Sequence, residues 1–380
     1  MDDPSSLLPR ARHVLELAKA DPRAAERALD ELSLADQVAV VCEAPLAWRA
    51  RVLALTPRPE EVIPRLPEAE LCFTVKAVGL DDASWMLEHA SANQILACLD
   101  LDGWSGLEID RPALERWMSV LSEAGEEPLL RAAHNLDPEL LVLYLRDRVE
   151  VALKPGKDEA EDWEPPDGAQ SIDGQFYIAA KRPGDDLAPL LRMLDTLFRN
   201  DYWLYFRLLQ GAMWELDSEL EEWALRWRTG RLEELGFPAW DEAMRIYGFI
   251  RPEKRGELAA DSRPLEVLAW SLPVWVPELP AALDSRHAVF RSVAELDPEE
   301  RQAFLYTFIA MANKVAVADR MPLGDAETLP ASMEKAAAIA SRGLEYIATD
   351  NGIGMADALQ RVTLERLFRV GASLEAESQK

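Results

Sequence analysis

The sequence predicts a mainly α-helical protein, and three observations support this prediction. Apolar side chains recur every three or four residues along most of the chain, as on one face of an amphipathic helix. Proline and glycine fall between these segments, where they end one helix and open the next. Only residues 149–183 have the composition of strands and a loop. We therefore expect an all-α fold with a small β-hairpin insertion.

The charge of the chain excludes two classes of partner. The 380 residues include 68 Asp and Glu against 41 Lys and Arg, which gives a net charge of -27. A nucleic-acid-binding surface needs Lys and Arg to neutralise phosphates, and an anionic membrane surface attracts the same cations. We therefore expect neither nucleic acid nor a membrane surface as a partner.

Targeting signals and membrane spans are not predicted. The N-terminus lacks a basic segment followed by an apolar one, as a secretory signal requires. No stretch approaches the ~20 apolar residues that a spanning helix needs. The three cysteines, Cys42, Cys72 and Cys98, lie in apolar contexts and are expected to be buried thiols. We expect a cytoplasmic protein without membrane insertion.

Known catalytic and metal-binding motifs do not occur in the sequence. No phosphate-binding glycine loop, serine-nucleophile motif or paired His and Cys ligands are present. The four histidines, His13, His89, His134 and His287, each stand alone. We therefore predict no catalytic residue, no metal site and no cofactor.

Residues 1–148 are predicted to form a superhelix of short stacked helices. Helix starts are indicated by Asp21-Pro22, by Ser33 with Asp36, and by Asp81, Ser91, Asp110 and Asp137-Pro138. Gly79 and Gly125 are expected to end helices. Helices of roughly ten residues cannot each bury a face alone, so they must stack on their neighbours.

Part of this region resembles the cytosolic N-domain of MgtE-type magnesium transporters. The segments ALDELSLADQVAVV, RLPEAELCFTVKAV and EHASANQILACLDLD carry the resemblance, which covers about residues 20–102. It implies a right-handed superhelix of short helices, with acidic side chains that contribute to regulatory magnesium binding. The chain has no transmembrane part, so the resemblance does not imply transport.

Residues 149–183 are predicted to form an acidic loop and a β-hairpin. The segment VEVAL has strand-like composition and precedes the acidic, proline-rich KPGKDEAEDWEPPDG. Asp173-Gly174 stands between two short apolar runs, QSI and QFYIAA. This dipeptide predicts a tight hairpin turn between those two runs.

Residues 184–250 are predicted to form an aromatic-rich helical core. Asp201 is expected to separate two helices, and Ser218 with Glu221 is expected to cap a third that ends at Gly230. Trp223 and Trp227 recur at helical spacing with Leu220 and Ala224, which predicts that all four face the core. The next helix is expected to turn Trp240, Met244 and Tyr247 inward.

Residues 251–380 are predicted to form a C-terminal helical domain. A proline-rich connector covers residues 251–281, and Asp297-Pro298 opens what is expected to be the longest helix, to about residue 320. Two more helices are expected at residues 326–348 and 355–370.

The whole chain also resembles an uncharacterised bacterial family of unknown function. The segments WELDSELEEWALRWRTGRLEELGFPAWDEAMRIY, ANKVAVADRM and TLERLFRVGASL carry this resemblance. It covers nearly the whole chain and implies no activity.

The candidate ligand-binding residues lie in the aromatic segment and are Glu222, Arg226, Trp227, Arg228 and Arg231. Carboxylates could perform acid–base chemistry or bind a cation, and arginines over indole rings could hold an anionic ligand. The same pattern also fits a charged outer face whose arginine stems pack over tryptophan. These alternatives stay open at this point.

The sequence favours a cytoplasmic, non-enzymatic interaction or scaffold protein. Stacked short helices present an extended groove that suits a peptide or a partner protein. The alternative is a sensor of divalent cations or of a small ligand, and the third hypothesis is an enzyme of unrecognised type. The oligomeric state is not predicted.

Overall fold

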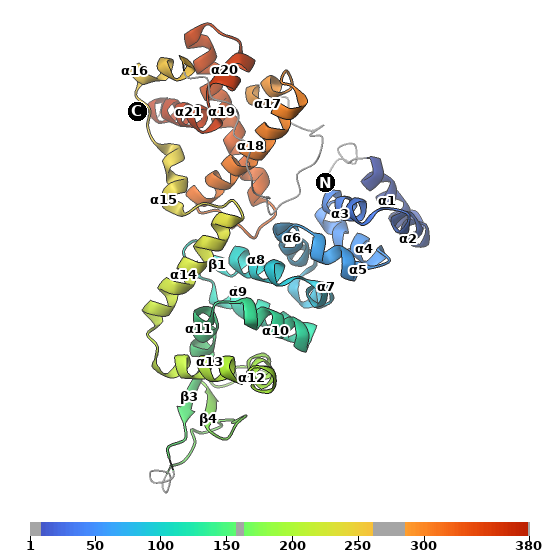
Figure 1. Ribbon diagram of the computed structural model, residues 1–380, viewed down its shortest axis with the longest axis vertical. Helices are drawn as coiled ribbons and strands as arrows, with labels where there is room; N and C mark the ends of the chain where they lie inside the picture. Colours follow the sequence, from blue (N-terminus) through green and yellow to red (C-terminus); the bar gives the residue numbers. More distant parts are fainter. Residues whose placement is uncertain (1–8, 157–162, 261–285, 379–380) are drawn as a thin grey trace. The chain divides into compact units, whose positions relative to one another are not determined.

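The computed structural model describes residues 9–156, 163–260 and 286–378 (Figure 1). Within these ranges the chain forms twenty-one α-helices and two antiparallel sheets of two strands each, which confirms the predicted fold class. The contacts divide the chain into an N-terminal unit, residues 14–228, and a C-terminal unit, residues 229–378, with residues 9–13 assigned to the latter. The predicted division into four segments stays a prediction.

The N-terminal unit is built from short helices in close succession. The two boundaries of this unit fall within helices, the first within α1 (Pro9–Ala20) and the second within α14 (Asp217–Glu234). The helices between them are α2 (Pro22–Asp30), α3 (Leu34–Glu43), α4 (Leu46–Leu55), α5 (Pro59–Val62), α6 (Glu68–Val78), α7 (Ser84–His89), α8 (Ala92–Asp102), α9 (Arg111–Ala124), α10 (Glu126–Asn135), α11 (Pro138–Arg148), α12 (Ala188–Asn200) and α13 (Tyr202–Trp214).

Most of the predicted helix boundaries in this unit are correct. The Asp21 side chain accepts hydrogen bonds from the first backbone amides of α2, and Ser91 forms a full capping box with Gln94. Gly79 and Gly125 end α6 and α9 with φ values of 100° and 123°, which favour glycine. The predicted cap at Asp81 is wrong, because this residue lies inside a short 3-10 turn, Leu80–Asp82.

Polar side chains from neighbouring helices satisfy the carbonyl groups at the ends of the short helices. Arg49 on α4 donates to the carbonyl oxygens of Cys42 and Ala44, at the end of α3, at 2.6 Å and 3.0 Å. Gln94 donates to the carbonyls of Ile63 and Leu66 at 2.7 Å and 2.8 Å. The last four carbonyls of a helix have no partner within that helix. These side chains therefore avoid the unfavourable free energy of burying a carbonyl group without a hydrogen bond.

The strand insertion is present, but its pairing differs from the prediction. β3 (Val149–Leu153) pairs with β4 (Phe176–Ala180), so VEVAL and not the QSI run supplies the partner strand. The Asp173-Gly174 turn does form, with Asp173 accepting from the amides of Gln175 and Phe176. The QSI run contributes only a bridge between Gln170 and Ile178. The smaller sheet pairs β1 (Trp104–Ser105) with β2 (Glu108–Ile109).

The C-terminal unit has longer helices around one apolar core. Its helices are α15 (Trp240–Ala243), α16 (Pro252–Arg255), α17 (Ala288–Val293), α18 (Pro298–Ala318), α19 (Thr328–Asn351), α20 (Met355–Arg361) and α21 (Leu364–Ser378). The Asp297 capping box opens α18 as predicted. The longest helix is α19 and not α18, and the expected last helix is divided into α20 and α21. Most of the predicted connector lies outside the described residues.

The core of this unit brings two helices unusually close together. Phe304, Phe308 and Phe368 are fully buried in it. A Cβ atom added to Gly343 on α19 would overlap the carbonyl oxygen of Leu367, and one added to Gly371 on α21 would overlap that of Ile339. The two backbones can approach this closely only because both positions are glycine. Of the inward stripe predicted near Trp240, Tyr247 packs against this core, but Met244 is exposed and the buried positions of the segment are Ala243 and Ile246.

Candidate functional site

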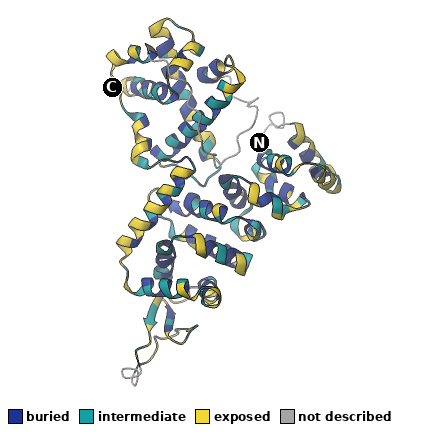
Figure 2. Ribbon diagram, viewed as in Figure 1, coloured by how far each residue is buried: buried dark blue, intermediate teal, exposed yellow. Residues whose placement is uncertain are grey.

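Two consecutive helices, α13 and α14, expose large apolar side chains to solvent. Trp203 is 77% exposed, although tryptophan is highly buried on average in folded proteins. The exposed apolar side chains on these helices and on the residues that join them, here called the aromatic surface, are Tyr202, Trp203, Trp214, Leu216, Trp223 and Trp227. Figure 2 shows that much of α14 is exposed.

The prediction that Trp223 and Trp227 face the core is wrong. Their exposed fractions are 44% and 49%, and the two rings stack on each other with centroids 6.0 Å apart. The buried stripe of α14 is Leu220, Ala224, Arg228 and Leu232. The hydrophobic pattern gave the wrong side of the helix because a buried position is occupied by an arginine, while both tryptophans lie next to the buried stripe on the solvent side. The helix also starts before Ser218 and continues through Gly230, so the predicted capping box and stop are wrong.

Arg228 has a structural environment. It is 5% exposed and donates to the carbonyl oxygens of Asp100 at 2.8 Å and Gly106 at 3.0 Å. Its guanidinium carbon also lies 4.9 Å from the centre of the Trp104 ring. Asp100 belongs to the last turn of α8, so Arg228 satisfies a helix end as Arg49 does. These contacts explain Arg228 without a ligand.

The other predicted site residues are on or near the solvent side of α14. Arg226 is exposed and its guanidinium carbon lies 5.1 Å from the centre of the Trp223 ring. Glu222 and Trp227 are exposed as well, while Arg231 is half-buried. At about 100° per residue, Arg226 and Glu222 lie about 160° and 120° from Arg228 around the helix axis, and Trp227 lies about 100° from it. The structure thus separates Arg228 from the three exposed residues with which it was predicted.

The four carboxylates in the first two turns of α14 fall into two groups. On the side that faces α11 and α9, Asp217 pairs with Arg146 at 2.5 Å and Glu221 pairs with Arg111 at 3.1 Å. Glu219 and Glu222 are exposed beside the tryptophan pair, and neither has an ion-pair partner among the residues that the structure describes. Asp217 and Glu221 are therefore neutralised by arginines of this chain, and Glu219 and Glu222 are not.

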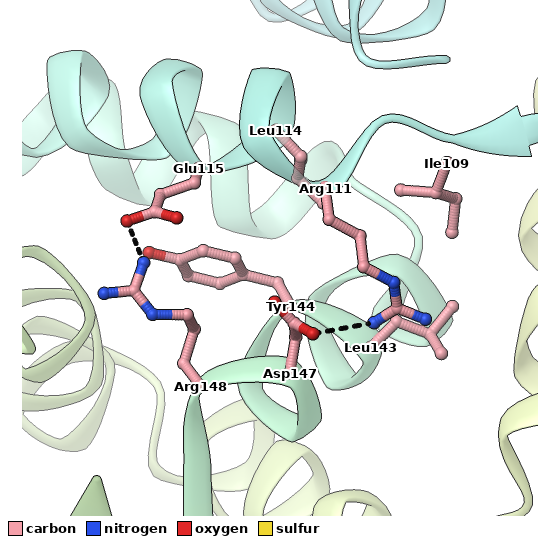
Figure 3. Close-up of a pocket in the computed structure, with 8 residues that line it drawn as sticks. All are labelled: Ile109, Arg111, Leu114, Glu115, Leu143, Tyr144, Asp147 and Arg148. Atoms are coloured by element: carbon pink, nitrogen blue, oxygen red, sulfur yellow. Dashed lines mark hydrogen bonds and ion pairs between the residues drawn. The ribbon is translucent and has the colours of Figure 1, made fainter. Parts of the chain in front are cut away.

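A charged hollow between α9 and α11 was not predicted from the sequence (Figure 3). Its enclosed space is about 10 Å³, which is room for about one water molecule. Figure 3 shows Arg148 paired with Glu115 on one side and Arg111 paired with Asp147, at 3.4 Å, on the other. The lining residues are Ile109, Arg111, Leu114, Glu115, Leu143, Tyr144, Asp147 and Arg148.

The charges in this hollow balance one another. Burial by itself lowers the pKa of Arg148, but the hydrogen bond and charge of Glu115 outweigh it, so the pKa lies above its ordinary value. Burial raises the pKa of Tyr144 to about 12, against a smaller opposing effect of Arg148. Both groups are therefore held in their neutral-pH forms, the guanidinium charged and the phenol neutral. Neither is poised to exchange a proton near neutral pH.

The sequence alone could not have identified this hollow, although one of its residues, Arg148, stands in an unusual place. Arg148 stands at the junction of α11 and β3, and its Nη2 atom also donates to the carbonyl of Asp186 at 2.8 Å. An arginine directly before an apolar strand indicates a buried cation that needs partners. The partners come from residues 33 to 38 positions away, which no local pattern reveals.

The described residues show neither a metal site nor a membrane-spanning helix. Within the described ranges, no group of three or more His, Cys, Asp or Glu side chains is arranged to hold a metal ion. None of the described helices combines the length and apolar character required to span a membrane. Cys42, Cys72 and Cys98 are free and buried, as predicted.

Comparison with known proteins places the chain in a family but gives it no activity. No curated protein and no solved structure matches it. A family model described as a family of unknown function, DUF6178, matches residues 26–380. This match covers the short-helix unit, the insertion and the C-terminal core. The chain therefore belongs to the DUF6178 family of unknown function.

Proposed function

We propose that this protein is a cytoplasmic, non-enzymatic interaction protein that binds a partner protein through the aromatic surface of α13 and α14. The observation that carries the proposal is the exposure of four tryptophans there: Trp203, Trp214, Trp223 and Trp227. A fully buried aromatic side chain removes about 150–250 Å² from water. A covering partner would bury the part of each indole that is now exposed, between 44% and 77% of its surface.

The chemistry of the surface supports binding to protein. Tryptophan, tyrosine and arginine are enriched among the residues that dominate the energetics of protein interfaces. Tryptophan and tyrosine bury much area at low conformational cost, and arginine offers several hydrogen-bond donors on a planar cation. Trp223 and Trp227 already stack on each other, which limits the rotamers that a partner would have to immobilise. Arg226 beside them adds a planar cation of the type enriched in interfaces.

The charged hollow gives less support to an enzyme. Ligand pockets in enzymes usually enclose about 300–1,000 Å³. The space between Tyr144 and its neighbours has room for about one water molecule, and its charges are already paired. The arrangement fits a polar joint between α9 and α11 better than a substrate site.

The proposal is tested by capture of partners at native expression level. The full chain with a small C-terminal tag is compared with the variant Trp203→Ala/Trp214→Ala/Trp223→Ala/Trp227→Ala after purification and size-exclusion chromatography. We expect the natural chain to elute as a complex with at least one other protein in a fixed ratio, and the variant to elute free. Elution of the natural chain as free monomer, or an unchanged complex with the variant, would contradict the proposal.

A further inference from the structure

The exposed side of α14 combines two features that together specify a partner. One is the stacked pair Trp223–Trp227. The other is the pair of exposed carboxylates Glu219 and Glu222, which have no ion-pair partner among the described residues. At 1.5 Å per residue, Glu219 to Trp227 spans about 12 Å, or slightly more than two helical turns.

Other carboxylates near the start of α14 are paired with arginines of this chain. Asp217 and Glu221 pair with Arg146 and Arg111, although both carboxylates are exposed. Glu215, at the end of α13, is paired with Arg207 at 2.6 Å. Among the described residues, Glu219 and Glu222 therefore differ from these three carboxylates in having no ion-pair partner.

The indole rings attract the same kind of group. The face of an indole ring carries negative potential and attracts guanidinium and ammonium groups. The chain uses this attraction itself, since Arg226 lies over Trp223 and Arg228 lies over Trp104. Glu219 and Glu222 lie on the exposed part of the same two turns of α14, so a segment that lies along this helix can place one cation on Trp227 and others on the glutamates. The net charge of -27 attracts such a segment to the chain.

We propose that the side of α14 formed by Glu219, Glu222, Trp223 and Trp227 binds a basic segment of a partner protein. Because Arg226 already lies over Trp223, the arginine or lysine side chains of this segment lie on the Trp227 ring and pair with the two glutamates. This inference rests on the proposed function and adds the chemistry of the partner. A second copy of this acidic chain does not fit, because like charges would face each other.

The test identifies the bound segment by photo-crosslinking. Gly230 follows Trp227 by three residues on the same side of α14, and a Cβ atom there would meet nothing within 4 Å. The full chain with photoreactive p-benzoylphenylalanine at position 230 is irradiated in cells that produce the protein naturally. The crosslinked peptide is then sequenced by mass spectrometry. We expect a segment with an excess of arginine and lysine over acidic residues.

Affinity for the identified partner then separates the two contributions. Glu219→Gln/Glu222→Gln keeps the shape of the surface and removes two charges, so we expect about tenfold weaker binding and a shallower salt dependence. The control Glu26→Gln/Glu60→Gln makes the same change in net charge at exposed positions on α2 and α5 and should leave affinity within about twofold. Trp223→Ala/Trp227→Ala should weaken binding at least about tenfold.

The outcomes distinguish this inference from the proposed function. If the tryptophan variant loses the partner while the glutamine variant binds normally, or the crosslinked segment is neutral, acidic or a second copy of the chain, the basic-segment inference fails and an aromatic interaction surface remains. If neither variant changes partner binding, the α14 surface is not the interface and this inference fails with it.

Discussion

The two units of this chain differ in how neighbouring helices are joined to one another. In the N-terminal unit, short helices end often, and side chains such as Arg49, Gln94 and Arg228 cross to neighbouring helices to satisfy the exposed carbonyls. In the C-terminal unit, α18 and α19 are long, and α19 meets α21 by direct backbone approach at Gly343 and Gly371. Each helix end leaves up to four carbonyls without partners, so a stack of short helices needs more polar joints per residue. The C-terminal unit also contains such joints, as where buried Arg255 donates to the carbonyl of Ile250, but its tightest helix contact is the backbone approach of α19 and α21.

The largest change in stability is expected at Gly343, where α19 and α21 of the C-terminal unit are too close together for a side chain. Gly343→Ala places a methyl group against the backbone of α21, so we expect the free energy of unfolding to fall by about 4 kcal/mol. Gly230→Ala is the matched control, because the same change meets open space and should raise stability by up to about 1 kcal/mol. Chemical denaturation measures both. Equal effects of the two substitutions would show that the close approach of α19 and α21 is not essential.

The next effect concerns a polar joint of the N-terminal unit. Arg49→Met removes the cation that pairs with the buried Glu70 carboxylate, so we expect a loss of about 3 kcal/mol in the free energy of unfolding. The double variant Arg49→Met/Glu70→Met removes the carboxylate as well and should recover about half of that loss. The rest belongs to the carbonyls of Cys42 and Ala44, which stay unpaired. A double variant no more stable than the single one would contradict this division.

A smaller effect appears only at alkaline pH. The folded chain raises the pKa of Tyr144 to about 12 from an ordinary value of 10, so the proton is bound more tightly in the folded state. The resulting stabilisation is complete below pH 10 and is lost as pH rises from 10 through 12, by about 2–3 kcal/mol for a shift of this size. Tyr144→Phe cannot ionise and should show a correspondingly smaller decline over that range. Denaturation curves from pH 8 to pH 12 that decline equally for both proteins would contradict the buried environment of Tyr144.

Local signals predicted much of this structure. Caps and stops such as Asp21, Ser91 and Gly125 act within one turn of a helix, so the residues that determine them are neighbours in sequence. The fold class followed from the same signals. The partner of β4 was missed because Asp173-Gly174 favours a turn but cannot state which distant strand will pair.

The candidate site was predicted less well, for a related reason. Residues 220–228 carry tryptophan and arginine at helical spacing, and hydrophobicity alone assigns the tryptophans to the core. The structure buries Arg228 instead, because the carbonyls of Asp100 and Gly106 offer it partners more than 120 residues away. The long-range hydrogen bonds of Arg228 therefore help to determine which side of α14 faces solvent.

The most direct test of the account asks whether the tryptophans of α14 serve the fold or a partner. Trp223→Ala/Trp227→Ala should change the free energy of unfolding by less than about 2 kcal/mol, because nearly half of each side chain is exposed, and should abolish capture of the partner. Trp117→Ala, which empties a fully buried position, should cost about 3–5 kcal/mol. If the α14 variant were destabilised as strongly as Trp117→Ala and captured the partner in proportion to its folded fraction, the tryptophans would be structural and the proposed interaction surface would be wrong.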